Sequence, residues 1–309
     1  MPKAKGTAET ISIVQLLRMF PTQESCIAWL EKVRWQGKPT CAHCNGTEKI
    51  SRSPKKPNAY WCGNCRKYFT VTTGTIMHST KTPLQNWIVA IYSVMTGRKG
   101  ISAMQLSKEL GVQYRTAWYM LHRVREACAG GEFCLDNVVE MDEAYIGGRE
   151  ANKHSHKKLK AGRGAVGKVA VMGARERGGA TVAMPVKDAD GETAIEFAKS
   201  VVKAGATIHT DNSRIYNKLP YKHESVNHSI GEYVRDDIHT NGIESVWAVL
   251  KRGIHGTWHH VSEKHLHRYV NEATMRLNNG NVKVDTLDRM NALVRSSSGK
   301  RIRYKDLIA

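Results

Sequence analysis

Four cysteines in the first quarter of the chain have the types and spacing of a metal site. They form two pairs separated by residues 45–61: Cys41 and Cys44, then Cys62 and Cys65. Two thiolates on one tight turn can reach a single ion, so two such turns supply the four sulfur ligands of tetrahedral zinc. Because four thiolates leave no position for water, we expect one structural Zn²⁺ ion. Buried cysteines without metal are the alternative. His43 lies inside the first pair, where it is poorly placed to be a ligand.

Three acidic residues further along have the order needed for metal-dependent phosphoryl transfer. Asp142 lies within a strand-like run, Asp211 ends another, and Glu244 stands near the start of an amphipathic helix. Carboxylates suit Mg²⁺, and two ions ~3.5–4 Å apart can activate a nucleophile and stabilise a leaving oxygen. We expect Asp142 to bridge two Mg²⁺ ions, with Asp211 and Glu244 holding one each. A lone acid at a strand end is more often a cap or an ion-pair partner, but the ordered trio favours a metal site.

Other polar residues flank this trio. Glu140 and Glu143 stand beside Asp142, and we expect strand alternation to turn both in other directions. Lys251 follows Glu244 by two helical turns on the same face, where it can hold a DNA phosphate. As a surface lysine it would need no role.

The elements around the acids follow the order of an RNase H-like domain. Predicted strands cover 138–146, 166–175, 180–186, 206–211 and 223–228, and predicted helices cover 189–202 and 240–253. In that fold the first and fourth strands lie side by side in a mixed sheet. An acid on each strand can therefore meet one from the last helix.

Residues 80–130 have the periodicity of a helix-turn-helix, with Gly111 at the turn. The start of the second helix is where this motif reads base edges. The candidate DNA contacts here are Gln113, Tyr114, Arg115, Thr116 and Arg123. A plain helical hairpin would show the same periodicity, but the neighbouring cysteine module and the basic residues favour DNA. Those basic residues are Arg115, His122, Arg123 and Arg125.

The charge of the chain also favours a polyanionic partner. Its 309 residues hold 47 Lys+Arg against 28 Asp+Glu, a formal net charge of +19. Bound phosphates release counterions, which favours nucleic acid over the alternatives of an acidic protein or a membrane surface. The basic loop 149–168 is expected to grip DNA backbone through Lys157, Lys158 and Arg163.

Neither a membrane span nor an export signal is predicted. No apolar run approaches the ~18 residues that would cross a bilayer, and the polar N-terminus lacks a signal peptide's apolar core. Seven cysteines in such a chain suggest metal rather than disulfides. We expect a cytoplasmic, nucleoid-associated protein.

The predicted fold class is α+β and multidomain. The expected parts are an N-terminal helical segment (1–37), a zinc ribbon (38–75), the helix-turn-helix segment (80–130), an RNase H-like α/β catalytic domain with a mixed sheet (135–280), and a loosely held basic C-terminal tail (281–309).

Three further stretches carry a family resemblance: VVEMDEAYIGG at 138–148, HTDNSRIYNKL at 209–219 and HTNGIESVWAVLKRGIHGTWHHV at 239–261. With the cysteine pairs, they resemble insertion-sequence transposases of the DDE superfamily. The most similar branch has an N-terminal zinc ribbon and is called the insertion-sequence fifteen-ninety-five type.

The resemblance implies Mg²⁺-dependent strand cleavage and transfer at terminal inverted repeats. It also implies target DNA and a homodimer or higher homo-oligomer in a synaptic complex. It places the first acid on Asp142, the second on Asp211 and the basic partner on Lys251. Branches differ in using Glu or Asn as the third member. Asn241 and Glu244 are one helical turn apart; charge neutralisation favours Glu244, and Asn241 then orients a ligand or water.

Two other functional classes compete with this interpretation. One is a non-catalytic DNA-binding protein derived from a transposase, against which the intact acid trio argues. The other is an RNase H-like nuclease that only cuts, such as a junction resolvase. The two N-terminal DNA-reading modules fit recognition of defined element ends better.

Overall fold

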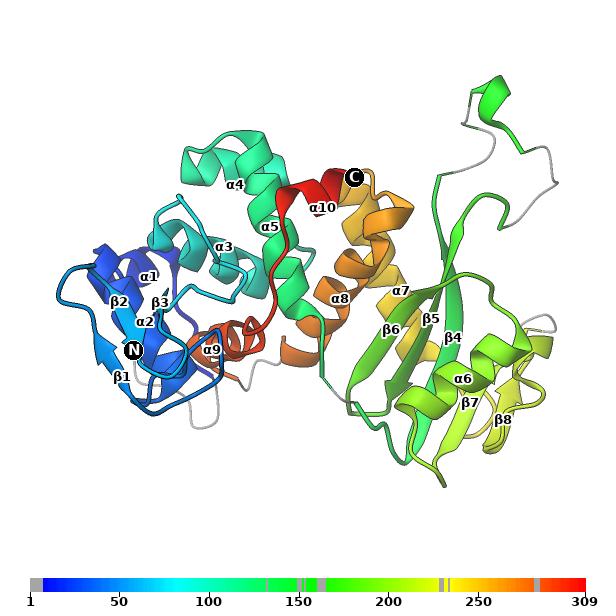
Figure 1. Cartoon of the computed structure of the whole chain (residues 1–309). Helices are drawn as coiled ribbons and strands as arrows, with labels where there is room; N and C mark the ends of the chain where they lie inside the picture. The colour runs from blue at the N-terminus through cyan, green and yellow to red at the C-terminus, as the bar shows by residue number, and fades with distance from the viewer. Residues whose placement is uncertain are drawn as a thin grey trace. The chain divides into compact units, whose positions relative to one another are not determined.

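The computed structural model describes residues 8–131, 133–148, 152, 154–159, 165–227, 231–232, 234–280 and 284–309. The chain divides into two compact units. The first combines Met1–Gly130 with Asn279–Ala309, and the second is Gly131–Asn278. Figure 1 shows a small sheet among helices in the first and a larger sheet in the second. No helix in the described part of the chain is long and apolar enough to cross a membrane.

The first unit builds a small antiparallel sheet next to helices. Its elements are α1 (Ile13–Met19), α2 (Gln23–Trp35), β1 (Ile50–Arg52), β2 (Ala59–Cys62), β3 (Lys67–Thr70), α3 (Leu84–Thr96), α4 (Ala103–Leu110), α5 (Tyr114–Cys128), α9 (Thr286–Ser296) and α10 (Tyr304–Ile308). The central strand β2 pairs with β1 and β3. Tyr60 of β2 stacks on Phe69 of β3, and Trp35 of α2 meets both rings edge-on. Aromatic packing thus attaches the sheet to α2.

The C-terminal residues differ from the predicted loose tail. Residues 286–296 form α9, which buries Met290, Leu293 and Val294, and Leu307 of α10 is also buried. The polar and serine-rich composition hid this apolar stripe. Its helical spacing gives α9 a face that packs on α2, α3 and α5.

The second unit contains a mixed sheet. Its elements are β4 (Val138–Ile146), η2 (Ser155–Lys157), β5 (Val169–Glu176), β6 (Thr181–Val186), α6 (Gly191–Val201), β7 (Thr207–Asp211), η3 (Arg214–Tyr216), β8 (Lys222–Val226), α7 (Asn241–Gly253), the π-helical turn η5 (Ile254–Trp258) and α8 (Glu263–Asn279). Among the described residues the strand order is β6-β5-β4-β7-β8. β4 and β7 are parallel neighbours, which confirms the predicted adjacency of the first and fourth strands.

Side-chain alternation along β4 decides which helix each of its residues meets. Val139 and Met141 enter a core completed by α6. Ala144 and Ile146 enter a second core, which α7 and α8 complete. The even-numbered residues of β4, Asp142 among them, therefore share the face that α7 covers.

Candidate functional site

Asp142 is held in one orientation by two hydrogen bonds. Trp247 of α7 donates its indole N–H to Asp142 Oδ2 at 2.9 Å. The backbone N–H of Glu143 donates to Asp142 Oδ1 at 2.8 Å. The first predicted acid therefore faces α7 with a fixed carboxylate, half-buried at the middle of β4.

Asp211 lies beside Asp142. The parallel register pairs Glu140 with His209, and each aspartate follows two residues later on its strand. The backbone N–H of Ser213 donates to Asp211 Oδ1 at 3.1 Å, which fixes this carboxylate as β7 ends. Burial, followed by the charges of Glu143 and Asp211, raises the pKa of Asp142 to about 7. The structure thus concentrates negative charge where the sequence predicted two metal ligands.

Glu143 belongs to this acidic cluster, although it was expected to turn in another direction from Asp142. Tyr216 of η3, itself fully buried, donates its hydroxyl to Glu143 Oε2 at 2.6 Å. Burial and the charge of Asp211 raise the pKa of Glu143 above its usual value. Alternation does place Glu143 on the other face from Asp142, yet Tyr216, five residues after Asp211, keeps it near both aspartates.

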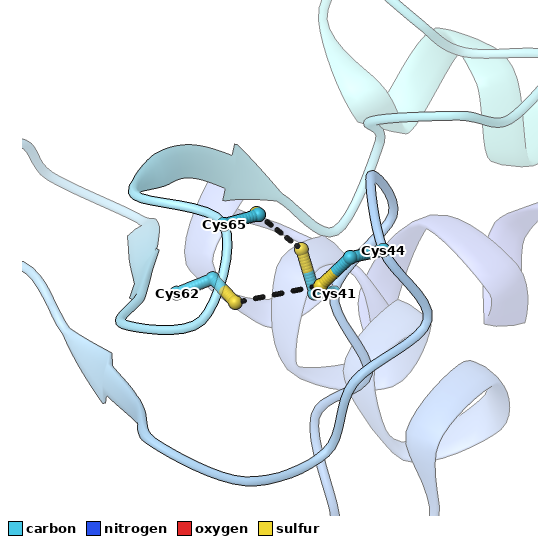
Figure 2. A group of neighbouring side chains, drawn as sticks. All are labelled: Cys41, Cys44, Cys62 and Cys65. Atoms are coloured by element: carbon cyan, nitrogen blue, oxygen red, sulfur yellow. Dashed lines mark hydrogen bonds between the residues drawn. The ribbon is translucent and has the colours of Figure 1, made fainter.

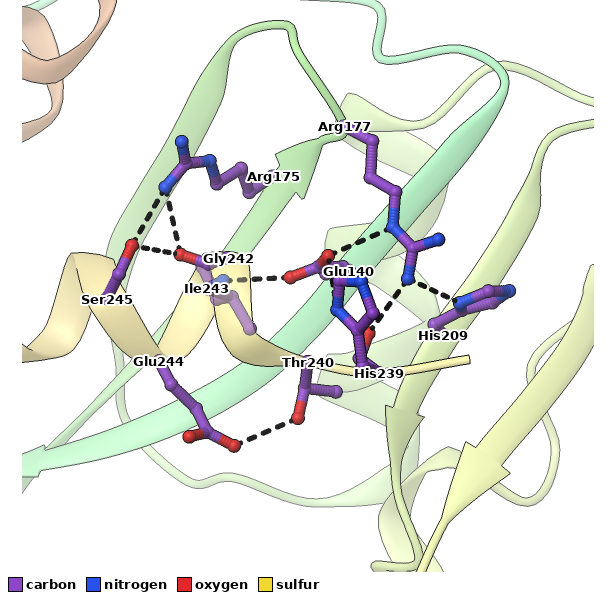
Figure 3. Close-up of polar contacts among 10 residues, drawn as sticks. All are labelled: Glu140, Arg175, Arg177, His209, His239, Thr240, Gly242, Ile243, Glu244 and Ser245. Atoms are coloured by element: carbon purple, nitrogen blue, oxygen red, sulfur yellow. Dashed lines mark hydrogen bonds and ion pairs between the residues drawn. The ribbon is translucent and has the colours of Figure 1, made fainter. Parts of the chain in front are cut away.

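The third member of the predicted trio lies in the first turn of α7. Glu244 accepts a hydrogen bond from Thr240 Oγ1 at 3.0 Å (Figure 3). Asn241, Glu244 and Lys251 are exposed residues of the same helix. No three carboxylates of the described residues gather tightly enough to hold one ion. Asp142 is close enough to Asp211 to feel its charge, and the Glu244 carboxylate contacts Thr240.

Glu140 corrects a second expectation. Residues two apart on a strand share a face, so Glu140 points toward α7 as Asp142 does, rather than away from it. Its side chain is only 2% exposed. Its carboxylate accepts hydrogen bonds from Arg177 of the turn after β5 and from the backbone N–H of Ile243 in α7. The alternation of β4 contained the signal that Glu140 belongs beside the site.

Gly173 allows Trp247 to reach Asp142. It pairs with Asp142 in the β4–β5 register, and a Cβ added there would lie 2.5 Å from Trp247 Cη2. We expect Gly173→Ala to displace the indole and to lower the free energy of unfolding by about 1–3 kcal/mol, as overpacking does. Thermal denaturation measures this loss. Gly256→Ala is the control, because its added Cβ would meet nothing within 4 Å; equal melting of the two variants would contradict this account.

The four cysteines meet as predicted. Their Sγ atoms all lie within 4.8 Å of one another, and Figure 2 shows them converging from two turns. The two turns share one backbone form: the N–H of Asn45 donates to the Cys41 carbonyl, and that of Arg66 to the Cys62 carbonyl. Hydrogen bonding from the backbone N–H of Cys65 lowers the pKa of Cys62 to about 7. The group is suited to bind a metal ion.

The second half of the predicted helix-turn-helix is α5. Gln113, Tyr114 and Arg115 are exposed at its start, and Thr116 is half-buried. Arg123 is not a surface residue: it is 4% exposed and donates to the His78 carbonyl. Its guanidinium also lies over the rings of Trp87 and Tyr119.

The basic residues predicted to contact DNA differ in their exposure. Arg123 is a packing residue rather than a DNA contact, and His122 and Arg125 are buried as well. Lys158 is exposed. The side chain of Lys157 and the whole of Arg163 lie outside the described residues.

The fold and its acids define a domain in which two parallel strands and a covering helix carry polar residues on a shared face. Residues 134–278 match the model of the ISXO2-like transposase domain. An uncharacterized protein in transposable element ISH50 of Halobacterium salinarum is 27% identical over 250 residues, covering 76% of this chain and 84% of that protein. Both findings support an insertion-sequence transposase of the ISXO2-like type. A transposase domain over residues 134–278 indicates an enzyme that cleaves nucleic acid.

Proposed function

We propose that the chain is an active DNA transposase that cuts and joins strands at the terminal inverted repeats of its insertion sequence. The observation that carries the proposal is the placement of Asp142 and Asp211 side by side on parallel strands, on a face covered by α7. The strand order β6-β5-β4-β7-β8 supports an RNase H-like assignment for Gly131–Asn278.

Two Mg²⁺ ions are the proposed catalytic metals, with Asp142, Asp211 and Glu244 as ligands. The donor set fits, because carboxylate oxygens are hard ligands. Burial, and after it the negative charges of Glu143 and Asp211, raises the pKa of Asp142, and a bound cation would offset those charges. When bound, the ions stabilise charge on the attacking and leaving oxygens. Trp247 and the Glu143 N–H orient Asp142. Rotation of the exposed Glu244 side chain away from Thr240 would complete the set.

The remaining residues on α7 and the first unit take supporting roles in this proposal. Asn241 orients a ligand or water, and Lys251 holds a DNA phosphate. The cysteine group binds one structural Zn²⁺, supported by its four converging sulfurs. Duplex contacts are assigned to Gln113, Tyr114, Arg115, Thr116, Lys157, Lys158 and Arg163. A homodimer or larger assembly would bring two element ends together with target DNA.

A strand-joining assay tests the proposal. Purified chain is incubated with Mg²⁺, a labelled duplex carrying the element's own end, and plasmid DNA. The expected product is the labelled strand covalently joined to plasmid. Hydrolysis without joining would instead identify a nuclease. End binding without either reaction would identify a DNA-binding derivative.

Arg115 is expected to read bases at the element end. It is exposed at the start of α5, and loss of a base contact costs about 1–3 kcal/mol of discrimination. Arg115→Ala should therefore weaken binding to the element end by roughly 10- to 100-fold and leave binding to random duplex unchanged. Lys108→Ala, at another exposed basic residue, is the control. Equal weakening on both duplexes would mean that Arg115 contacts phosphate.

A further inference from the structure

The helix α7 begins without a side-chain cap of its own. Its N-cap residue Thr240 makes no capping hydrogen bond, and the Thr240 hydroxyl donates to Glu244 instead. The first backbone N–H groups of a helix need partners from elsewhere. Ile243 finds one across the domain, donating its N–H to Glu140 Oε2 at 3.0 Å. A carboxylate from β4 thus takes the capping position, where its charge also interacts favourably with the helix dipole.

Several groups direct the Glu140 carboxylate to this position (Figure 3). Arg177 donates from Nε to Glu140 Oε1 at 3.1 Å. His239 Nδ1 lies 3.3 Å from the same oxygen, which allows an ion pair when the imidazole is protonated. Gly242 leaves room, because a Cβ there would lie 2.5 Å from Glu140 Oε2. Both carboxylate oxygens are therefore engaged.

Neighbouring strands hold the same helical turn. Arg175 of β5 donates from Nη1 to the Gly242 carbonyl and to Ser245 Oγ, each at 2.9 Å. Arg177 donates from Nη2 to the His239 carbonyl at 3.3 Å and lies at the same distance from His209 Nδ1 on β7. Groups from β4 and β5, and from the turn after β5, thus converge on the start of α7.

This turn carries the residues that complete the proposed site. Glu140 accepts the N–H of Ile243, and Glu244 is the next residue of α7. On β4, Asp142 lies two residues after Glu140. Buried ion pairs add little net stability, since desolvation offsets their attraction. These contacts instead fix the position of the first turn of α7.

We propose that Glu140 is a positioning residue of the proposed transposition site: it caps α7 and so sets the place of Glu244 relative to Asp142. The catalytic half of this inference rests on the proposed function. The mechanical half, that Glu140 fixes the start of α7, stands on the contacts alone.

Glu140→Gln in the full chain is the decisive variant. The carboxylate accepts from Ile243 on one oxygen and from Arg177 on the other. An amide keeps one of these acceptor oxygens and replaces the other with a donor NH₂ group, so one of the two contacts is lost. A hydrogen bond to a charged group contributes about 1.5–3 kcal/mol, which corresponds to a roughly 10- to 100-fold change. We expect amide exchange at residues 241–245, measured without metal, to accelerate by that factor, with exchange in β4, β5 and α6 unchanged.

Joining assays supply the second readout. Glu140→Gln should slow joining and raise the Mg²⁺ concentration for half-maximal rate, with end binding unchanged. Glu176→Gln is the matched control, because Glu176 lies in the strand pair β4–β5 but accepts from Asn137 rather than from α7.

Three results would overturn the inference: unchanged exchange at 241–245, acceleration spread equally through the domain, or local acceleration with wild-type joining. Failure of the wild-type chain to join DNA would sink the proposed function instead. The exchange result would still decide whether Glu140 holds α7.

Discussion

Alanine in place of Asp142 is expected to reduce strand joining at least about 10³-fold, because a bound metal ion contributes several kcal/mol of transition-state stabilisation and about 1.4 kcal/mol is a factor of ten. Asp142 combines a mid-strand position with two hydrogen bonds that fix its carboxylate. Asp211→Ala should have the same consequence, since Asp211 ends the neighbouring parallel strand. The measurement is the initial rate of joining in Mg²⁺, with end binding recorded for each variant.

The control for these variants is Asp136→Ala. Asp136 belongs to the same unit but is an exposed acid paired with Lys203 at 2.8 Å. The Asp136→Ala variant should join DNA at the wild-type rate. Retained joining by Asp142→Ala would exclude Asp142 as a metal ligand and remove the central assignment of the proposed function.

The third ligand is settled by the same assay. Glu244→Ala should lose strand joining as the two aspartate variants do, because a carboxylate neutralises metal charge and an amide does not. Asn241→Ala should retain measurable joining. The reverse result would make Asn241 the ligand, and would explain why Glu244 is hydrogen-bonded to Thr240.

The site could be predicted from sequence where local pattern decides the structure. The strand-like run 138–146 predicted β4 with the bounds that the structure has, and the order of strands and helices implied that β4 and β7 are neighbours. The cysteine spacing similarly required two matching turns. In each case the relevant residues are close in sequence, or their placement follows from the order of elements.

The burial of Arg123 and the contacts of Glu140 could not be predicted, because they depend on residues distant in the sequence. The cationic group of Arg123 on a helix would ordinarily favour solvent, but the His78 carbonyl and the rings of Trp87 and Tyr119 satisfy it inside the unit. Alternation along β4 could place Glu140 on the same face as Asp142, but its hydrogen bond to Ile243 could not be predicted because the two residues lie 103 positions apart.

Removal of metal from the cysteine group is expected to unfold the ribbon spanning 38–75. Its strands are short, β1 holding 3 residues and β2 and β3 holding 4 each, and a small sheet of this kind seldom has enough apolar burial to fold alone. Structural zinc contributes roughly 10–16 kcal/mol in zinc-finger peptides. The aromatic contacts of Trp35 with Tyr60 and Phe69 are too few to replace it.

Chelation should therefore expose residues 38–75 to protease and rapid amide exchange, while Gly131–Asn278 remains protected. Cys62→Ser should lose the one zinc ion per chain that elemental analysis is expected to find. Cys134→Ser, at an exposed thiol outside the cysteine group, should keep it. Because zinc binds the thiolate form of cysteine, protons compete with the metal as the pH falls, and zinc should be released on acidification. A ribbon that stays protected after complete metal removal would show that aromatic packing alone holds it, and the cysteines would then need another explanation.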